Sequence, residues 1–308
     1  MCLGNKLTVS SQRLFDDRTR RKLEQLMLVA QRVRVGAIKG DRRSAKRGSS
    51  IEFVGYRNYV QGDDLRHLDW NLYARTEKPY IKQYEDEQDL AVHILIDQSE
   101  SMNFPLHAEP TDHHKFTYAK RLAAGIATIA MSTNDRLRLT AAHADQVERF
   151  GPARGRNFQV PLYQFLQRLK PHTTLDFNQF LSDYAKHERL PGLLFILSDL
   201  FHRDAYREGL QALIGRGYEV AVVQVLAPNE LDPSLLGDLR LVDAENFVPQ
   251  DVSLDQDMRQ LYLRRVRQWQ TELSRQFRQQ GIHYVLARTD VSFERIILND
   301  LRRLGLVR

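Results

Sequence analysis

The chain has 308 residues, of which 42% are hydrophobic, so it can bury a substantial core in one large domain with additions or in two small ones. This composition excludes an intrinsically disordered chain. The single cysteine, Cys2, excludes an internal disulfide framework and a cysteine-built zinc or iron–sulfur site. The longest apolar runs are far shorter than the roughly 20 residues that a bilayer-spanning helix needs. We therefore expect a cytoplasmic protein without a transmembrane segment.

The net charge of +6 is concentrated near the N-terminus. Residues 1–47 contain thirteen Lys or Arg and four Asp or Glu, so the rest of the chain carries a net charge of −3. Residues 18–34 place apolar residues at helical spacing, which predicts an amphipathic helix with a basic outer face. Such an arm is one way to bind nucleic-acid phosphates, but no aromatic residues are interleaved to stack on bases. We therefore favour a solvated or protein-docking surface over nucleic-acid binding.

From residue 90 onward, short apolar runs alternate with helical patterns. We expect strands at 90–97, 136–143, 193–200, 218–227 and 283–289, and helices at 115–133, 157–169, 176–188, 204–215, 255–280 and 292–304. This alternation is typical of an α/β domain with a mostly parallel central sheet, whose apolar strands are buried on both faces. Together with the basic region, it suggests an N-terminal helix and lead-in block at 1–89 and an α/β domain at 90–308.

Two features lie near the C-terminal end of this pattern. The alternation and Asn, Asp and Pro content at about 235–253 predict a small hairpin inserted into the α/β domain. The long helix at 255–280 carries apolar residues on one face, which we interpret as core packing. The residues of this stripe are Met258, Leu261, Tyr262, Val266, Trp269, Leu273 and Phe277.

Two of the predicted strands end on an aspartate, Asp97 in "HILID" and Asp199 in "LFILSD". In an open parallel sheet, ligands collect beyond the carboxyl ends of the strands. Ser99 and Ser101 follow Asp97, and this spacing through a turn can bring three oxygen-bearing side chains to one side. Such oxygens suit Mg²⁺ or Mn²⁺. Helix capping by Asp97 is the structural alternative.

The motif elements are Asp97-x-Ser99-x-Ser101, a threonine in "PHTTLDF", and Asp199. Together they resemble the metal-ion-dependent adhesion site (MIDAS) of von Willebrand factor type A (vWA) domains. The resemblance implies a vWA-like, Rossmann-like fold and one bound divalent ion, whose shell an acidic residue of a partner completes. The register of the following helix favours Thr174 as the loop ligand, with Thr173 as the alternative.

A second stretch narrows the resemblance. In the bacterial family called domain of unknown function 58 (DUF58), a Tyr-x-x-Gly-Asp-Asp-x-Arg-x-x-Asp-Trp string precedes the vWA domain. In this chain the string is Tyr59, Gly62, Asp63, Asp64, Arg66, Asp69 and Trp70, within a block at 52–89 that is similar to the family's. The string forms no recognisable catalytic constellation. We favour a structural role, in which the first two aspartates cap a turn, Arg66 pairs with Asp69 and Trp70 fills the core.

The resemblance also implies a setting. Relatives are commonly encoded beside MoxR-type AAA+ ATPases, in pairs that act as chaperone-like systems for complex assembly or metal-cofactor insertion. We therefore expect a non-enzymatic adaptor with a MoxR-type AAA+ ATPase as partner and no small-molecule substrate. The alternative is a Mg²⁺-dependent hydrolase or phosphatase. Against it, the chain has no Gly-x-Ser-x-Gly elbow and no Gly-rich phosphate loop, and Ser99 stands where such phosphatases carry a second Asp.

Overall fold

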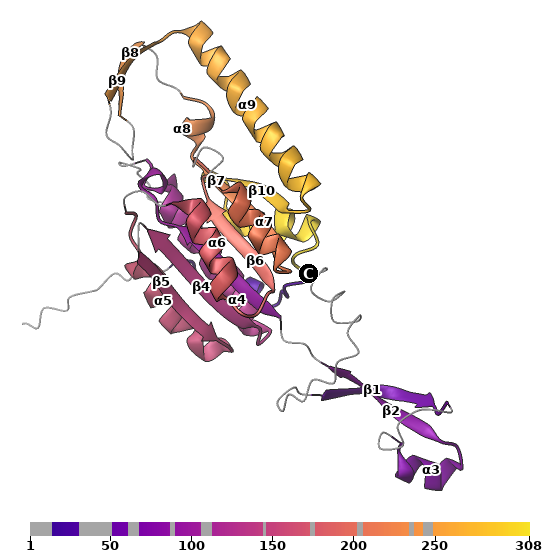
Figure 1. The fold of residues 1–308 in the computed structure, drawn as a ribbon. Helices are drawn as coiled ribbons and strands as arrows, with labels where there is room; N and C mark the ends of the chain where they lie inside the picture. Colours follow the sequence, from indigo (N-terminus) through magenta and orange to yellow (C-terminus); the bar gives the residue numbers. More distant parts are fainter. Residues whose placement is uncertain are drawn as a thin grey trace, which may run out of the picture. The chain divides into compact units, whose positions relative to one another are not determined.

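The computed structural model describes residues 14–30, 51–60, 68–86, 90–105, 113–143, 146–172, 176–201, 206–233, 237–242 and 249–308. The chain divides into two compact units, one formed by residues 1–38 with 90–308 and the other by residues 39–89. Figure 1 shows the elements of both units. Within the described segments, no helix combines the length and hydrophobicity needed to cross a membrane.

A six-stranded sheet lies at the centre of the larger unit, with the strand order β10–β7–β6–β3–β4–β5. The strands are β3 (Ala91–Asp97), β4 (Arg136–His143), β5 (Gln146–Ala153), β6 (Leu193–Ser198), β7 (Glu219–Leu226) and β10 (His283–Arg288). All neighbours are parallel except β5, which pairs antiparallel with β4 at the edge. The predicted α/β fold with a mostly parallel sheet is confirmed. The apolar-run pattern missed β5 because this edge strand is mostly solvent-exposed.

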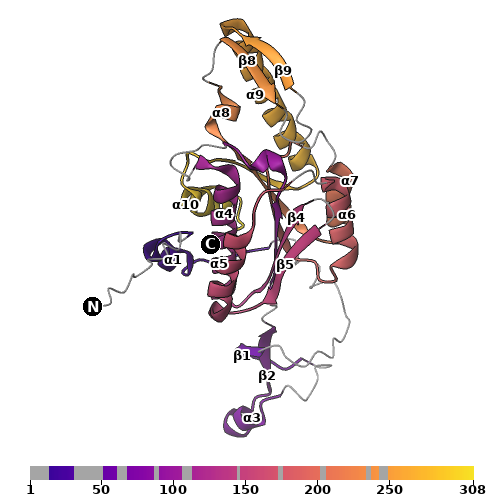
Figure 2. The same ribbon diagram turned by 90° about the vertical axis from the view of Figure 1, so that its left-hand side faces the viewer.

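Helices cover both faces of the sheet (Figure 2). One face is covered by α4 (Lys115–Ser132), α5 (Gln159–Arg168), the short α10 (Phe293–Arg295) and a π-helix (Ile296–Leu301). The other is covered by α6 (Phe177–His187), α7 (Arg207–Gly215) and the C-terminal end of α9 (Gln256–Gln279). The helix predicted at 292–304 is therefore a short α-helix continued by a π-helix.

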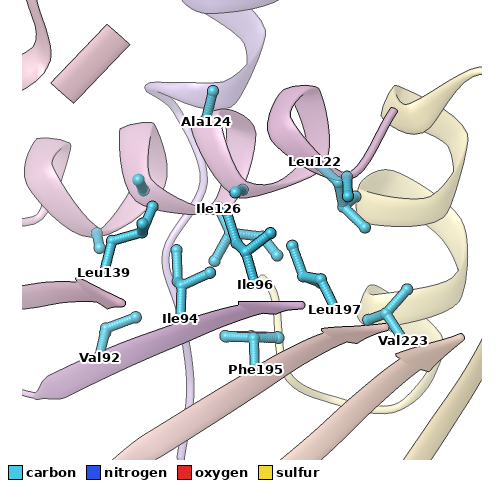
Figure 3. Close-up of a cluster of buried hydrophobic side chains, with 14 of the residues drawn as sticks. Val92, Ile94, Ile96, Leu122, Ala124, Ile126, Leu139, Phe195, Leu197 and Val223 are labelled. Atoms are coloured by element: carbon cyan, nitrogen blue, oxygen red, sulfur yellow. The ribbon is translucent and has the colours of Figure 1, made fainter. Parts of the chain in front are cut away.

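The strands separate two hydrophobic cores because successive side chains point to opposite faces. Ile94 and Ile96 of β3 face α4, as Figure 3 shows, whereas Leu95 belongs to the core beneath α6. All three side chains are fully buried. Burial on both faces explains why β3 is apolar at every position except His93 and the final Asp97.

The predicted basic helix at 18–34 is shorter than expected in the described residues. It forms α1 (Asp17–Leu23), and the chain then leaves the helix. Met27 and Arg308 exchange two backbone hydrogen bonds of 3.0 Å, so this segment pairs with the C-terminus of the chain. Leu23 is fully buried in the core beneath α4. Tertiary pairing therefore overrides the helical spacing.

The smaller unit contains an antiparallel pair, β1 (Ile51–Asn58) and β2 (Tyr80–Asp86), and the helix α3 (Trp70–Thr76). Asp69 caps α3 by accepting hydrogen bonds from the N–H groups of Asn71 and Leu72, and it also accepts one from the Tyr56 hydroxyl. Trp70 is 61% exposed, so the prediction that it fills a core is wrong.

The remaining residues of the family string are less completely described. Tyr59 is half-buried, and its N–H donates to the Pro79 carbonyl at 3.0 Å. Gly62, Asp63, Asp64 and Arg66 lie outside the described residues, and so does the predicted pairing of Arg66 with Asp69.

The predicted inserted hairpin is present as β8 (Gly237–Val242) and β9 (Pro249–Leu254), between α8 (Pro228–Leu231) and α9. Figure 1 shows it at the N-terminal end of α9. The prediction that the whole apolar stripe of α9 packs in the core is wrong. Only Leu273 and Phe277 are buried, while Met258, Leu261 and Tyr262 are 43%, 38% and 37% exposed.

Candidate functional site

The two aspartates predicted at strand ends lie at the same edge of the sheet. Ile96 pairs with Leu197, so Asp97 at the end of β3 adjoins the end of β6. The Ser198 hydroxyl donates a 2.6 Å hydrogen bond to Asp97 Oδ2 and accepts the Leu200 N–H at 3.0 Å. Asp97 and Ser198 are both fully buried. The pairing of β3 with β6 is therefore enough to bring Asp97 and Ser198 together.

The loop after β3 brings the two serines beside Asp97. The Ser99 N–H donates to Asp97 Oδ1 at 2.9 Å, and the hydroxyls of Ser99 and Ser101 are 3.0 Å apart. A 3₁₀ turn (Glu100–Met102) follows, and the fully buried Met102 anchors it. The spacing prediction thus corresponds to a real cluster of one carboxylate and two hydroxyls.

Helix capping does not explain this cluster. The next long helix, α4, is capped by His114, whose Nδ1 accepts from the Thr117 N–H at 3.3 Å. The Ser99 side chain makes no cap hydrogen bond to the 3₁₀ turn. Asp97 instead closes a tight turn onto its own loop.

A buried lysine lies beside Asp199 and was not identified from the sequence. Lys115 is fully buried, and its Nζ donates to Asp199 Oδ2 at 2.8 Å and to Glu230 Oε1 at 2.5 Å. Lys115 is the first residue of α4, where a cation is disfavoured by the helix dipole. That unfavourable position was the one local signal that an acidic partner from elsewhere in the chain stabilises it.

Burial opposes the charged form of Lys115, but the carboxylates of Asp199 and Glu230 together outweigh it and hold the pKa of this lysine above its ordinary value. The aromatic face of Phe201 lies 4.8 Å from the ammonium and adds a cation–π contact. Lys115 and Asp199 are both fully buried, and Glu230 is mostly buried beside them.

The Asp199 carboxylate is held from both sides. Oδ2 accepts from Lys115, and Oδ1 accepts from the N–H of Phe201 at 3.1 Å. Leu200, between them, has a φ of 62°, in the left-handed region that a bulky residue rarely adopts. The backbone is thus turned sharply to keep Asp199 and Phe201 together at the edge.

Thr173 and Thr174 lie outside the described residues, so the choice between them as a metal ligand stays a prediction. The residue before them is described. The His172 N–H donates to the Gln98 carbonyl at 2.7 Å, and its ring stacks on His143 with centroids 3.9 Å apart. The loop that carries the two threonines therefore begins next to the residue that follows Asp97.

The donor set fits a hard cation held by oxygen. Among the described residues, no group of three or more His, Cys, Asp or Glu is arranged to hold a metal ion. Binding at this edge would therefore depend on serine hydroxyls and carboxylate oxygens, with water in the remaining positions. Such ligands suit Mg²⁺ and Mn²⁺ better than softer metals.

Comparison with known proteins places the chain among uncharacterised relatives. A family model described as "Protein of unknown function DUF58" matches residues 55–272. "Uncharacterized protein Rv1480" of Mycobacterium tuberculosis and "Uncharacterized protein Mb1516" of Mycobacterium bovis are each 26% identical over 272 residues, covering 87% of this chain and 84% of the relative.

Two solved structures share part of the fold. The conserved hypothetical protein BatB from Bacteroides thetaiotaomicron superposes with a TM-score of 0.41 and 16% identity, covering 70% of this chain and 98% of BatB. An aerotolerance-related membrane protein from Bacteroides fragilis gives 0.42 and 16%, covering 70% of this chain and 99% of that protein.

Proposed function

The chain belongs to the family described as protein of unknown function DUF58, and we propose that it is a non-enzymatic adaptor that binds a partner protein through one divalent cation. Asp97, Ser99 and Ser101 are the ligands of this proposal, with Asp199 and Thr174 or Thr173 in the outer positions. A bound ion would supply Lewis-acid character, and these residues would leave room for a carboxylate of the partner to bind it.

One observation carries this proposal, the convergence of three oxygen-bearing side chains where a fully buried strand ends. Ser99 and Ser101 bring their hydroxyls within 3.0 Å of each other beside Asp97. Three oxygen-bearing side chains at this spacing form part of the shell that a hard cation needs, and water or a partner would supply the rest.

The buried charges support an acidic ligand from outside. Asp97 is the one carboxylate in the cluster that it forms with Ser99 and Ser101, and Asp199 already forms an ion pair with Lys115. A divalent ion held mainly by one carboxylate and neutral oxygens keeps an affinity for another anionic oxygen. A partner's Asp or Glu meets that requirement, so the ion would contribute specificity as well as affinity.

The nature of the partner comes from the family resemblance. We propose a MoxR-type AAA+ ATPase, with this protein acting in chaperone-like complex assembly or cofactor insertion. A cytoplasmic location belongs to the same proposal and stays a prediction.

Metal binding and partner binding are measured separately. Titration calorimetry with Mg²⁺ or Mn²⁺ on wild type, Asp97→Asn and the exposed α6 control Asp183→Asn tests the ion. We expect binding that Asp97→Asn abolishes and Asp183→Asn retains. Mg²⁺ at 100 times its Kd stabilises the wild-type fold by about 2.7 kcal/mol.

Binding to the MoxR-type ATPase of the same genome is then compared in Mg²⁺ and in EDTA. We expect wild type to bind more tightly in Mg²⁺, and Asp97→Asn to bind as weakly in Mg²⁺ as wild type does in EDTA. The adaptor proposal fails if wild type and Asp97→Asn bind equally under both conditions. Hydrolysis of p-nitrophenyl phosphate in Mg²⁺ that Asp97→Asn abolishes would instead favour the phosphatase alternative.

A further inference from the structure

The N-terminal half of α9 exposes an apolar surface. Leu261 and Tyr262 follow Met258 by three and four residues, Arg265 follows Leu261 by four, and Trp269 follows Arg265 by four. These five residues therefore share one side of the helix. We call these five residues the α9 face. Met258, Leu261 and Tyr262 are each more than a third exposed, and Arg265 is exposed beside them. This face continues the stripe that ends in the core, so its hydrophobicity is not explained by packing in the described residues.

The α9 face is continuous with the sheet edge that carries the aspartates. The ring of Trp269 stacks on Phe201, with centroids 5.7 Å apart and planes 24° apart. Phe201 is 41% exposed, and its N–H is bonded to Asp199. The exposed surface therefore runs from Phe201, which adjoins the buried Asp199, through the Trp269 ring onto α9.

The helix is held in place beside this edge by α8. The Tyr262 hydroxyl donates to the Glu230 carbonyl at 2.5 Å, and Arg259 donates to Asp232 Oδ1 from Nε at 3.1 Å and from a terminal nitrogen at 2.6 Å. Glu230 also binds Lys115. A surface that is rigid before binding loses less conformational entropy when a partner docks.

The charge around the α9 face is positive. Arg265 is exposed on the α9 face and has no ion-pair partner among the described residues. Arg264 and Arg267 are also exposed, towards the other side of the helix. The whole helix contains six arginines and two acidic residues, Asp257 and Glu272, so its net charge is +4. A partner that covers this face must therefore supply negative charge as well as apolar surface.

We propose that the α9 face and Phe201 form a docking surface for an acidic and apolar patch of a partner protein. The inference rests on the proposed function, because the partner is the one whose carboxylate reaches the cation. Tyrosine, tryptophan and arginine, which the α9 face combines, are the residues that dominate binding energy at protein interfaces.

Two other occupants are less compatible with this surface. A second copy of the chain in a two-fold contact would place the arginines of one α9 against those of the other, and like charges repel. A bilayer would meet the arginines through lipid phosphates, but it would not place a protein carboxylate at the cation of the proposed function. A protein with acidic side chains satisfies both the arginines and the cation.

The test uses Leu261→Glu and Arg265→Glu, with Arg278→Glu as the matched control on the exposed side of the C-terminal half of α9. The probe is the MoxR-type AAA+ ATPase of the same genome, and its Kd is measured by biolayer interferometry in Mg²⁺ and in EDTA. We expect each α9-face variant to raise the Kd about tenfold or more in both conditions. Arg278→Glu stays within about twofold of wild type. Thermal unfolding verifies that all three variants fold.

The outcomes separate this inference from the proposed function. Wild-type affinity in both α9-face variants overturns the docking surface, and leaves metal-dependent docking intact if Asp97→Asn is defective. Weak binding by the α9-face variants with normal binding by Asp97→Asn overturns the metal step and retains the surface. Absence of wild-type binding overturns both.

Two further measurements address the other occupants. Sedimentation that shows a wild-type dimer abolished by Arg265→Glu would assign the face to a second copy. Binding to phosphatidylglycerol vesicles that Arg265→Glu abolishes would assign it to a membrane. Either result overturns the docking surface, which predicts a monomer that does not bind vesicles.

Discussion

The neighbouring strands β3 and β6 both lead into a buried aspartate, but the two carboxylates have different partners. Asp97 accepts hydrogen bonds from the Ser198 hydroxyl and the Ser99 N–H, which are neutral donors. Asp199 pairs with the ammonium of Lys115. Neutral donors leave a carboxylate's charge in place, whereas an ammonium cancels it. Similar sequence contexts have thus produced one carboxylate that is bonded to the neighbouring strand and to its own loop, and one that is paired with a buried lysine.

The largest expected effect comes from removing the buried ammonium of Lys115, which lies beside the end of β6. Lys115→Met leaves Asp199 and Glu230 without their shared ammonium, so we expect the free energy of unfolding to fall by about 3–5 kcal/mol in urea denaturation. Lys186→Met, at an exposed ion pair, should cost under about 1 kcal/mol. Equal costs for the two variants would contradict the difference between the strand ends.

A second prediction concerns another buried group of β3. His93 has its Nδ1 2.8 Å from the Tyr184 hydroxyl, and burial lowers its pKa to about 4. Because the folded-state pKa lies below the unfolded value of 6.5, the stabilisation is complete above about pH 6.5 and is lost as the pH falls towards 4. The loss amounts to about 3 kcal/mol.

Urea denaturation of wild type and His93→Gln across this pH range measures the effect. The variant should lose most of the acid sensitivity while remaining less stable than wild type at neutral pH. An identical pH dependence for the two proteins would show that β3 tolerates a protonated histidine.

The smallest expected effect concerns the hydrogen bond that Ser198 of β6 donates to Asp97 at the end of β3. Ser198→Ala removes the hydroxyl that donates to Asp97 and accepts from Leu200, so we expect a loss of about 1–2 kcal/mol. In a double-mutant cycle with Asp97→Asn, the two changes should couple by about 1 kcal/mol. Additive effects would mean that the serine and the aspartate act independently.

The strand ends were predictable because the apolar runs themselves are local. All residues of β3 and β6 are buried, so both strands are largely apolar, with His93 as the polar residue inside β3, and each run is followed by a carboxylate at or just after the strand end. Lys115 was not predictable, because its partners Asp199 and Glu230 lie 84 and 115 residues away in the chain. Local patterns carry no information about which distant charges meet.

The edge strand β5 and the apolar stripe of α9 show that local sequence patterns also do not determine which residues are exposed. Strand β5 lacks an apolar run because most of its residues are exposed at the edge of the sheet; Val147, for example, is 40% exposed. On α9, helical spacing predicted an apolar face correctly, but spacing cannot tell whether another element lies opposite. Leu273 meets the sheet and Leu261 does not.

By itself, the sequence determined the alternation of strands and helices, the aspartates at two strand ends and the serines that follow the first. These features depend on side-chain periodicity and on turns of a few residues. Only the tertiary structure decided that Lys115 joins Asp199, that α1 ends at Leu23 and that half of α9 stays exposed. Those outcomes depend on which segments, far apart in the chain, come into contact, because such contacts determine charge pairing and burial.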